Sequence, residues 1–338
     1  MDSETKSDSG TEPISLLRIG EGSSFGKNNW WSSEDWHKIS PNGFASDVSC
    51  DAGTTGELAI AAISLRGHKH RLDGLPNEDG FAVRVSRSQV GEEYAILVLC
   101  DGLSSAKLSS YAARRVSSLV ADMLSTAIED PHFVFEKLGQ ALNACLVETI
   151  APELIRWPAP SKYLSLPAFG SPRVACEDVS PSDLLVTLTA AVVPTRNGEK
   201  GASEVFLATI GDSPAFILLK NGDWIRPSYG EMDDSVLTTA TAAFPKTTEA
   251  AVTQIMLYEG DTLCLMSDGV GNFVQKSSGT LRLGDHLSKV WKSPRDLITL
   301  IRDVSFDLRS ADDDRTVILC WTDREVTESA PLEEIGPK

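Results

Sequence analysis

The sequence predicts an α+β fold, with antiparallel sheets and helices that are set apart from the strands. Two observations support this prediction. Apolar, strand-like runs follow one another in groups at hairpin spacing, and helical periodicity is confined to separate stretches between those groups. A doubly wound parallel fold would instead alternate strands and helices along the whole chain. Because the long elements all contribute apolar residues, we expect them to share one core.

The elements follow from the spacing of the apolar residues. Apolar runs predict strands, in order, at 57–64, 81–85, 94–100, 184–193, 204–210, 215–219, 255–258, 261–267 and 315–321. A period of 3.6 residues predicts helices at 105–127 and 132–150. A further helix is expected near 294–308, with Ser293 as its N-cap and Pro294 at its first position. Residues 151–182 and 227–250 predict irregular segments.

Composition and charge exclude several classes of protein. Of the 338 residues, 41% are hydrophobic and 23% are charged, which is close to a soluble globular average. The chain carries 31 Lys and Arg against 48 Asp and Glu, a net charge of −17. Such an acidic chain is unsuited to broad contact with nucleic acid, because phosphate binding needs clustered cations. The excess of carboxylates favours hard cations that bind through oxygen ligands.

The sequence also suggests where the protein works. No apolar run reaches the ~18 residues that span a bilayer. The N-terminus, Met1 to Glu4, is acidic and polar, and it lacks the basic start and apolar core of a secretory signal. The six cysteines are too sparse for a disulfide framework and show no zinc-ligand spacing. We therefore expect a cytoplasmic protein that does not contact a membrane.

The two ends of the chain differ from its middle. Residues 1–55 are polar with little periodicity and predict an extension, residues 56–323 predict one domain, and residues 324–338 predict a charged tail. Trp30, Trp31 and Trp36 fall close together within the extension. Two interpretations remain open for them: they fill a groove on the domain, or they form a patch that binds a partner.

Acidic residues occur where the predicted strands begin or end. Asp101 and Asp268 each directly follow an apolar strand and precede a glycine. Glu78 and Asp79 precede another strand, and Asp312–Asp314 precede the last one. Because the end of one antiparallel strand lies beside the start of its neighbour, all four groups can gather at one edge of a sheet.

Gathered carboxylates repel one another, and divalent cations remove that conflict. Two metal ions ~3.5–4 Å apart can share a water and lower its pKa, which creates a nucleophile suited to a phosphate ester. Oxygen-only ligands favour Mg²⁺ or Mn²⁺ over zinc. The acidic strand ends therefore predict a two-metal site for these ions.

Six short motifs occur in a fixed order between Gly67 and Cys320. They are Gly67-His68-Lys69-His70-Arg71 through Pro76-Asn77-Glu78-Asp79, Val98-Leu99-Cys100-Asp101-Gly102, Leu188-Thr189-Ala190-Ala191-Val192, Ala208-Thr209-Ile210-Gly211-Asp212-Ser213-Pro214-Ala215, Leu265-Met266-Ser267-Asp268-Gly269, and Asp313-Asp314-Arg315-Thr316-Val317. With these motifs the chain resembles the metal-dependent Ser/Thr protein phosphatases of type 2C. The form of the first motif resembles the bacterial branch.

The resemblance implies a four-layer α/β/β/α sandwich of two antiparallel sheets flanked by helices, with two Mn²⁺ or Mg²⁺ ions at one edge between the sheets. It implies that Asp101 bridges both ions. Glu78 and the carbonyl of Gly102 would hold one ion, and Asp268 and Asp313 would hold the other.

The resemblance assigns further roles around the ions. Asp79 would act through a metal-bound water. The phosphate-binding arginine is Arg71 by its position, with Arg66 as the alternative because the spacing before Glu78 is longer here. A third ion would use Asp183, although the register differs by about one residue. Asp212 is expected to lie in a structural turn and not to be a ligand.

The chain departs from the family in two motifs. Many relatives carry a histidine, a candidate general acid, directly after the first Asp-Gly, where this chain has Leu103. Protonation of the leaving group would then need His70, a metal-bound water, or no protein group. The usual small residues at one strand start are replaced by Leu185-Val186-Thr187.

The resemblance implies a metal-dependent phosphatase that hydrolyses phosphoserine or phosphothreonine by in-line attack of a metal-bridging hydroxide. Its partners would be a phosphorylated protein substrate and an opposing Ser/Thr kinase in a signalling system, with no nucleic acid and no membrane, and the protein would be a monomer. Asp101, Asp268, Arg71 and Asp79 are the expected catalytic residues. Two alternatives stay open: an inactive phosphatase-like sensor or binding domain, and a hydrolase of small phosphate esters on the same fold.

Overall fold

The computed structural model describes residues 47–156, 179–198, 201–227, 242–276, 279–308 and 310–322. The tryptophans Trp30, Trp31 and Trp36 and the tail 324–338 lie outside the described residues, as do most of the two segments predicted to be irregular. Within the described residues, none of the helices has both the length and the apolar character needed to cross a membrane.

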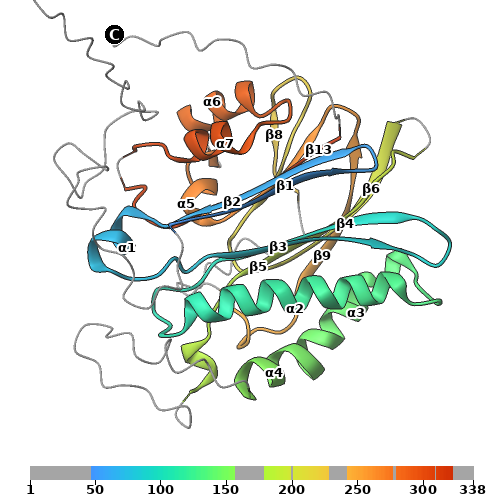
Figure 1. The fold of residues 1–338 in the computed structure, drawn as a ribbon, viewed down its shortest axis with the longest axis horizontal. Coiled ribbons are helices and arrows are strands. Elements are labelled where there is room, and N and C mark those ends of the chain that lie inside the picture. The colour runs from blue at the N-terminus through green and yellow to red at the C-terminus, as the bar shows by residue number, and fades with distance from the viewer. Residues whose placement is uncertain are drawn as a thin grey trace, which may run out of the picture.

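Two antiparallel sheets face each other, and helices cover both outer faces (Figure 1). The first sheet contains, in spatial order, β1 (Val48–Thr55), β2 (Leu58–Leu65), β13 (Arg315–Trp321), β10 (Thr262–Met266), β7 (Ala215–Leu218) and β8 (Trp224–Ile225). The second sheet contains β3 (Gly80–Arg87), β4 (Glu93–Cys100), β5 (Leu188–Pro194), β6 (Ala202–Ile210) and β9 (Ala251–Tyr258). A small hairpin pairs β11 (Gln275–Lys276) with β12 (Gly279–Thr280).

The helices form the two outer layers. The layer on the second sheet consists of α2 (Ser109–Glu129), α3 (Leu138–Cys145) and α4 (Ala151–Arg156), with a π-helical turn at Leu146–Ile150 between the last two. The layer on the first sheet consists of α5 (Asp268–Gly271), α6 (Arg282–Val290) and α7 (Leu297–Val304). The short helix α1 (His68–Asp73) connects β2 to the segment before β3. The predicted α/β/β/α sandwich is therefore confirmed.

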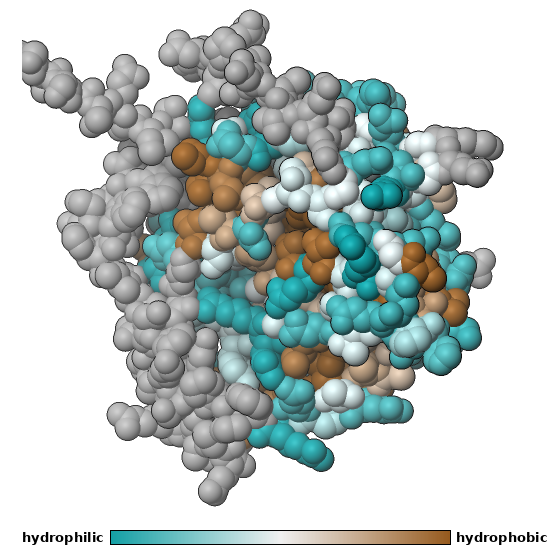
Figure 2. Space-filling view, turned by 45° about the vertical axis from the view of Figure 1, so that its right-hand side comes forward, coloured by the Kyte–Doolittle hydropathy of each residue, from teal (hydrophilic) through white to brown (hydrophobic). Residues whose placement is uncertain are grey.

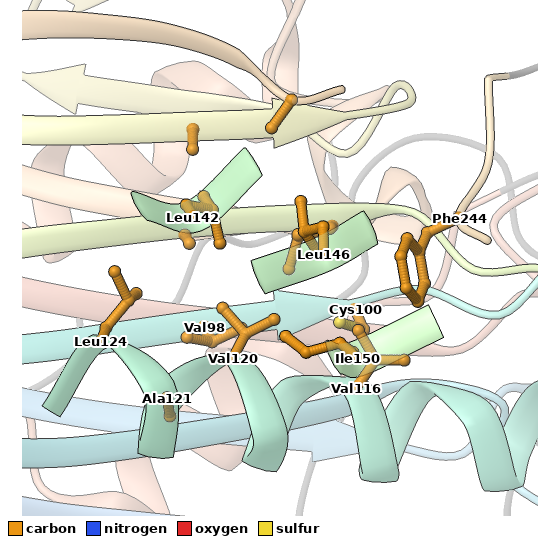
Figure 3. Packing of buried hydrophobic residues seen from close by; sticks show 14 of the residues in the cluster. Val98, Cys100, Val116, Val120, Ala121, Leu124, Leu142, Leu146, Ile150 and Phe244 are labelled. Atoms are coloured by element: carbon orange, nitrogen blue, oxygen red, sulfur yellow. The ribbon is translucent and has the colours of Figure 1, made fainter. Parts of the chain in front are cut away.

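The central strands are continuously apolar because both of their faces are buried. In β4, Leu97 and Leu99 pack between the two sheets, whereas Val98 and Cys100 pack against the helices. Figure 3 shows Val98 and Cys100 beside residues of α2, with the turns from α3 onward closing the cluster. Burial on both faces explains why these strands read as uninterrupted apolar runs and do not alternate.

One strand was not predicted. Residues 48–55 form β1, which pairs with β2 over its whole length, from Val48 opposite Leu65 to Thr55 opposite Leu58. The strand contains Asp51 and Gly53 and is largely exposed at the edge of its sheet, so it carries no apolar periodicity. Residues 48–55, which were predicted to lie in the extension, therefore belong to the first sheet.

The last helical layer also differs from the prediction. The helix expected to begin after Ser293 starts at Leu297, and its N-cap is Asp296, whose carboxylate accepts a hydrogen bond from the Thr299 amide at 2.9 Å. An N-cap side chain must reach the amide two or three residues on, and Asp296 satisfies this condition. Helix α6 was not predicted, because its buried residues are only Leu283, Gly284 and Leu287.

The end of the sandwich opposite α1 has a mixed surface. Figure 2 brings this end forward and shows hydrophobic residues in separate patches among hydrophilic ones. A groove of about 730 Å³ opens here, lined by residues that include Arg87, Glu92, Tyr94, Phe135 and Arg196. The acidic residues singled out in the sequence are absent from its lining.

Candidate metal centre

The acidic strand ends meet at one edge of the sandwich. In the second sheet Gly80 pairs with Cys100, so Asp79 and Asp101 lie at neighbouring strand ends. In the first sheet the Ser267 amide donates to the Thr316 carbonyl at 2.9 Å, which places the end of β10 beside the start of β13. The predicted gathering therefore uses both sheets, two strand ends from each, and not one edge of a single sheet.

A hydrogen bond joins the two sheets at this edge. The Asp268 amide donates to Oδ2 of Asp101 at 3.3 Å. Asp101 is itself held by Thr187, whose amide donates to the Asp101 carbonyl at 2.7 Å and whose Oγ1 accepts from the Asp101 amide at 3.2 Å. Thr187 Oγ1 also lies 2.7 Å from Ser213 Oγ. The altered motif at 185–187 thus still supplies a hydroxyl that fixes Asp101.

Asp79 is buried and held by hydroxyl groups. The hydroxyl of Thr316 donates to Asp79 Oδ2 at 2.7 Å, and the Asp79 amide donates to Asn77 Oδ1 at 2.9 Å. Asn77 Nδ2 in turn donates to Ser64 Oγ at 2.8 Å. This network fixes the orientation of the Asp79 carboxylate between the two sheets.

Glu78 and Asp313 are each linked to Asp314 by a hydrogen bond. The Glu78 amide donates to Asp314 Oδ2 at 2.6 Å, and the Asp314 amide donates to Asp313 Oδ1 at 3.0 Å. The Glu78 carbonyl accepts from the Gly102 amide at 3.1 Å, so Gly102 lies beside this group. Asp313 is exposed to solvent, whereas Glu78 is only 13% exposed.

Burial and mutual repulsion raise the pKa values of the clustered carboxyls. Burial is the largest cause for Asp101, whose pKa lies well above the usual range, and the charges of Asp79, Asp268 and Asp313 add to the shift. The pKa of Asp268 is raised to about 6 by burial and then by Asp313 and Asp212. Burial is also the main cause of the raised pKa of Asp79. Cations placed among these groups would relieve the repulsion.

The carboxylates of this group also shift the pKa of a buried histidine, His70. Burial alone would lower the pKa of His70, but the nearby carboxylates of Asp314, Glu78 and Asp313 raise it to about 9. Burial raises the pKa of Glu78 to about 7 even though His70 lowers it. His70, Asp313 and Asp314 each offer a ligand atom within 4.8 Å of the others, which is a spacing compatible with a metal ion.

The donor set fits a hard divalent cation. The charge of Asp313 raises the pKa of both Asp101 and Asp268, Asp101 accepts a hydrogen bond from the Asp268 backbone, and Gly102 donates to the Glu78 carbonyl. Carboxylate and carbonyl oxygens are the ligands that Mg²⁺ and Mn²⁺ prefer. The residues present therefore suit the ions that the sequence implies.

The two candidate arginines lie at or near α1, Arg66 shortly before it and Arg71 within it. Arg66 Nε lies 2.8 Å from Asp47 Oδ1, and its guanidinium also donates to the Leu75 carbonyl at 3.4 Å. Arg71 is buried in α1. Burial lowers the pKa of Arg315 to about 9, and the positive charge of Arg71 contributes to this shift. The assignment of a phosphate-binding arginine stays a prediction.

Other predicted residues have local roles. Asp183 Oδ2 accepts hydrogen bonds from the Ser180 amide at 2.9 Å and its hydroxyl at 3.0 Å, which caps a short helical turn. A third ion at Asp183 stays a prediction. Leu103 packs with Ala106, Leu185 and Ala243 in a small apolar cluster directly after Gly102.

Sequence reasoning missed part of the site. It treated Asp212 as part of a structural turn, yet the charge of Asp212 raises the pKa of Asp268. It gave no role to Thr187, Thr316 or Asp314, all of which bond to the backbone or carboxylates of the predicted ligands. The third aspartate of Asp312–Asp314 could have been found from its position directly before a fully buried strand.

A glycine at this edge is required by close packing. A Cβ on Gly269 would lie 2.0 Å from the Asp314 carbonyl oxygen, which belongs to the backbone. We expect Gly269→Ala to lower the free energy of unfolding by ~1–3 kcal/mol or more and to weaken metal binding, because β10 and β13 must separate. The control is Gly53→Ala, since no atom lies within 4 Å of a Cβ at Gly53. Equal stability of the two variants in urea denaturation would contradict this packing argument.

A comparison with known families identifies the family of this chain. The described residues form a four-layer sandwich with a group of carboxylates at one edge. The family model described as Protein phosphatase 2C matches residues 66–300. The chain therefore belongs to the protein phosphatase 2C family. No curated protein matches the chain in sequence.

Several solved structures are similar in fold. The serine/threonine phosphatase of S. agalactiae is 15% identical, with 78% of this chain and 99% of that chain covered and a TM-score of 0.48. The catalytic domain of the phosphatase PstP, solved with two manganese ions, is 18% identical, with 78% and 97% covered and a TM-score of 0.45. Stp1 from Staphylococcus aureus is 16% identical, with 81% and 94% covered and a TM-score of 0.43.

Proposed function

We propose that this protein is a metal-dependent phosphatase that hydrolyses phosphoserine or phosphothreonine in proteins. The observation that carries the proposal is the hydrogen bond between the Asp268 amide and Asp101 Oδ2, which joins the acidic ends of the two sheets. This bond brings Asp101 and Asp268, the candidate ligands from the two sheets, into contact, and the contact supports a shared centre. Membership of the protein phosphatase 2C family supports the same reaction.

Each ligand candidate has a distinct place in the proposed centre. Asp101 would contact both ions, with Glu78 and the Gly102 carbonyl on one and Asp268 and Asp313 on the other. Bound Mn²⁺ or Mg²⁺ would lower the pKa of a coordinated water for in-line attack on phosphorus and would neutralise charge on the phosphoryl oxygens. The chain's own part is to hold these oxygen ligands in a fixed arrangement.

The surrounding side chains restrict the motion of the ligands. Thr187 bonds to the Asp101 backbone and holds it in place. Thr316 donates to Asp79, so the Asp79 carboxylate cannot rotate away without losing a buried hydrogen bond. Asp79 would orient water near the ions. Arg71, or Arg66 in its place, would bind the phosphate. A guanidinium held in a fixed position stabilises the negative charge that develops on the phosphoryl oxygens in the transition state.

The shape of the edge favours a macromolecular substrate. Asp313 and Asp212 are exposed, so the rim of the centre reaches the surface of the protein. An open rim admits a phosphorylated segment of another protein, whereas a small phosphate ester would be better held in a closed pocket. The opposing partner would be a Ser/Thr kinase, and the protein would act as a cytoplasmic monomer. The proposed units are the extension before β1, a domain that runs from Val48 to residue 323 and includes β1, and the tail 324–338.

The test of the function is phosphate release from a phosphothreonine peptide. The protein would be stripped of metal with a chelator, dialysed, and assayed with Mn²⁺ or Mg²⁺ added back. We expect release only with added metal and none from Asp268→Asn. Release by the stripped protein without metal would contradict the proposal, as would full activity of Asp268→Asn at saturating metal. Metal binding without any release would favour the sensor or small-molecule alternatives.

Leu103 predicts an unusual dependence on the leaving group. Leucine cannot donate a proton, so the leaving oxygen must depart as an anion or take its proton from another source. We expect kcat for a series of aryl phosphates to fall steeply as the leaving-group pKa rises. Leu103→His should raise kcat for the phosphothreonine peptide by ~100-fold while changing the best aryl phosphate little. Leu103→Gln is the polar control, and identical slopes for wild type and Leu103→His would show that position 103 has no such role.

A further inference from the structure

Asp314 is a buried carboxylate that accepts three hydrogen bonds. The Gly67 amide donates to Oδ1 at 2.5 Å, the Glu78 amide donates to Oδ2 at 2.6 Å, and His70 Nδ1 lies 2.8 Å from Oδ2. The residue is only 3% exposed. Its three partners come from the start of α1, from α1 itself and from the residue before Asp79, so one side chain ties α1 and the Glu78 backbone to the start of β13.

These contacts fix Glu78 relative to Asp313. Asp313 directly precedes Asp314 and accepts the Asp314 amide on its own Oδ1 at 3.0 Å. The backbone of Gly67 packs so closely here that a Cβ would lie 2.3 Å from the Asp313 carbonyl carbon. The separation between the two proposed ligands therefore depends on one buried carboxylate and one close backbone contact.

His70 extends this arrangement to the Glu78 side chain. Its ring is 2% exposed, and Nδ1 faces Asp314 while Nε2 lies 3.7 Å from Glu78 Oε2. The bond to Asp314 sets the orientation of the ring and thus directs Nε2 at the Glu78 carboxylate. A carboxylate that orients an imidazole next to a metal site is a common outer-shell arrangement in metalloproteins.

We propose that Asp314 and His70 are positioning residues of the metal centre. Asp314 holds the backbone of Glu78 and the ring of His70, and His70 limits the motion of the Glu78 side chain. Neither residue is proposed to contact substrate. The inference rests on the proposed function, because it presupposes that Glu78 and Asp313 bind metal.

The test is Mn²⁺ affinity, measured by isothermal titration calorimetry on folded protein well below its melting temperature. Asp314→Asn keeps the size of the side chain but replaces an acceptor oxygen with a donor. His70→Asn keeps a donor near the position of Nδ1 and removes the group that faces Glu78, so it serves as the second variant if Asp314→Asn does not fold. The matched control is Asp303→Asn, because Asp303 is equally buried and accepts from Trp291 Nε1 and Arg295 Nε, each at 3.2 Å.

We expect the dissociation constant for Mn²⁺ to rise ~10–100-fold in Asp314→Asn and ~10-fold in His70→Asn. Asp303→Asn should lower the melting temperature and leave the dissociation constant for Mn²⁺ unchanged. This control distinguishes an effect on the metal ligands from a general loss of stability. Wild-type affinity in folded His70→Asn and Asp314→Asn would overturn the inference. Failure of the wild type to bind Mn²⁺ would instead refute the metal centre itself, and with it the inference.

Discussion

Asp101→Asn should abolish phosphate release and leave the protein folded. Asp101 is the residue expected to contact both ions, and its loss should remove several kcal/mol of transition-state stabilisation. Because each 1.36 kcal/mol corresponds to a tenfold change in rate, kcat should fall ~1000-fold or more. The measurement is single-substrate kinetics on a phosphothreonine peptide at saturating Mn²⁺, with circular dichroism to check the fold.

The same substitution should not harm stability in the presence of a chelator. The pKa of Asp101 lies well above its usual range because of burial and neighbouring acids, so a neutral amide is tolerated better there than a carboxylate. Asp122→Asn is the control, since Asp122 is 59% exposed and forms a surface ion pair with Arg84. A loss of kcat in Asp101→Asn that is smaller than tenfold would contradict the bridging role.

Without divalent metal, the stability of the protein should fall as pH rises from about 4.5 to 9. Burial raises the folded-state pKa of Glu78 from 4.5 to about 7, and Asp268 is raised from 3.8 to about 6. Nearby carboxylates raise the pKa of His70 from 6.5 to about 9 despite its burial. In all three cases the folded state binds more protons than the unfolded state, so its stability decreases with pH.

The pH windows differ between the groups. The contribution of His70 is complete below about pH 6.5 and is lost by about pH 9. The contributions of Asp268 and Glu78 are lost between about pH 4 and 7. Each shifted pKa unit is worth ~1.4 kcal/mol for an isolated group, and the three contributions share the same sign. The lowered pKa of Glu93 acts in the opposite direction, but Glu93 is paired near the surface and contributes little.

Thermal unfolding with a chelator at pH 5, 6, 7 and 8 measures this dependence. We expect the melting temperature to fall steadily, and saturating Mg²⁺ to restore most of it at pH 7 and 8, where the carboxylates ionise around the cation. Glu78→Gln should flatten the curve below pH 7. A melting temperature that does not change over this range, with or without Mg²⁺, would show that the acids do not repel one another.

Much of the fold follows from local pattern. The apolar run at Tyr94–Cys100 and the period of 3.6 after it predict β4 and α2, because a strand covered on both faces and a helix covered on one leave different patterns. β1 escaped prediction since backbone pairing with β2, and not apolar burial, holds it in place. The N-cap at Asp296 was missed because a serine followed by a proline, as in Ser293-Pro294, is also typical of the first residues of a helix.

Part of the candidate site was also predictable from local sequence pattern. Strand ends mark Asp79, Asp101 and Asp268, and antiparallel pairing brings neighbouring ends together. The contact between the acidic ends of the two sheets depends on long-range packing, and no local sequence pattern encodes that packing. Asp314 was therefore not assigned a role, since its partners Gly67 and Glu78 are more than 230 residues away.

The most direct test of the central claim is the number of Mn²⁺ ions that the protein binds. Titration calorimetry, supported by electron paramagnetic resonance of free Mn²⁺, would compare wild type with Asp101→Asn and Glu78→Gln near neutral pH. The gathered carboxylates predict two ions in the wild type, one in Glu78→Gln, and at most one in Asp101→Asn. No binding by the wild type, or two ions in all three proteins, would contradict the account of this edge as a two-metal centre.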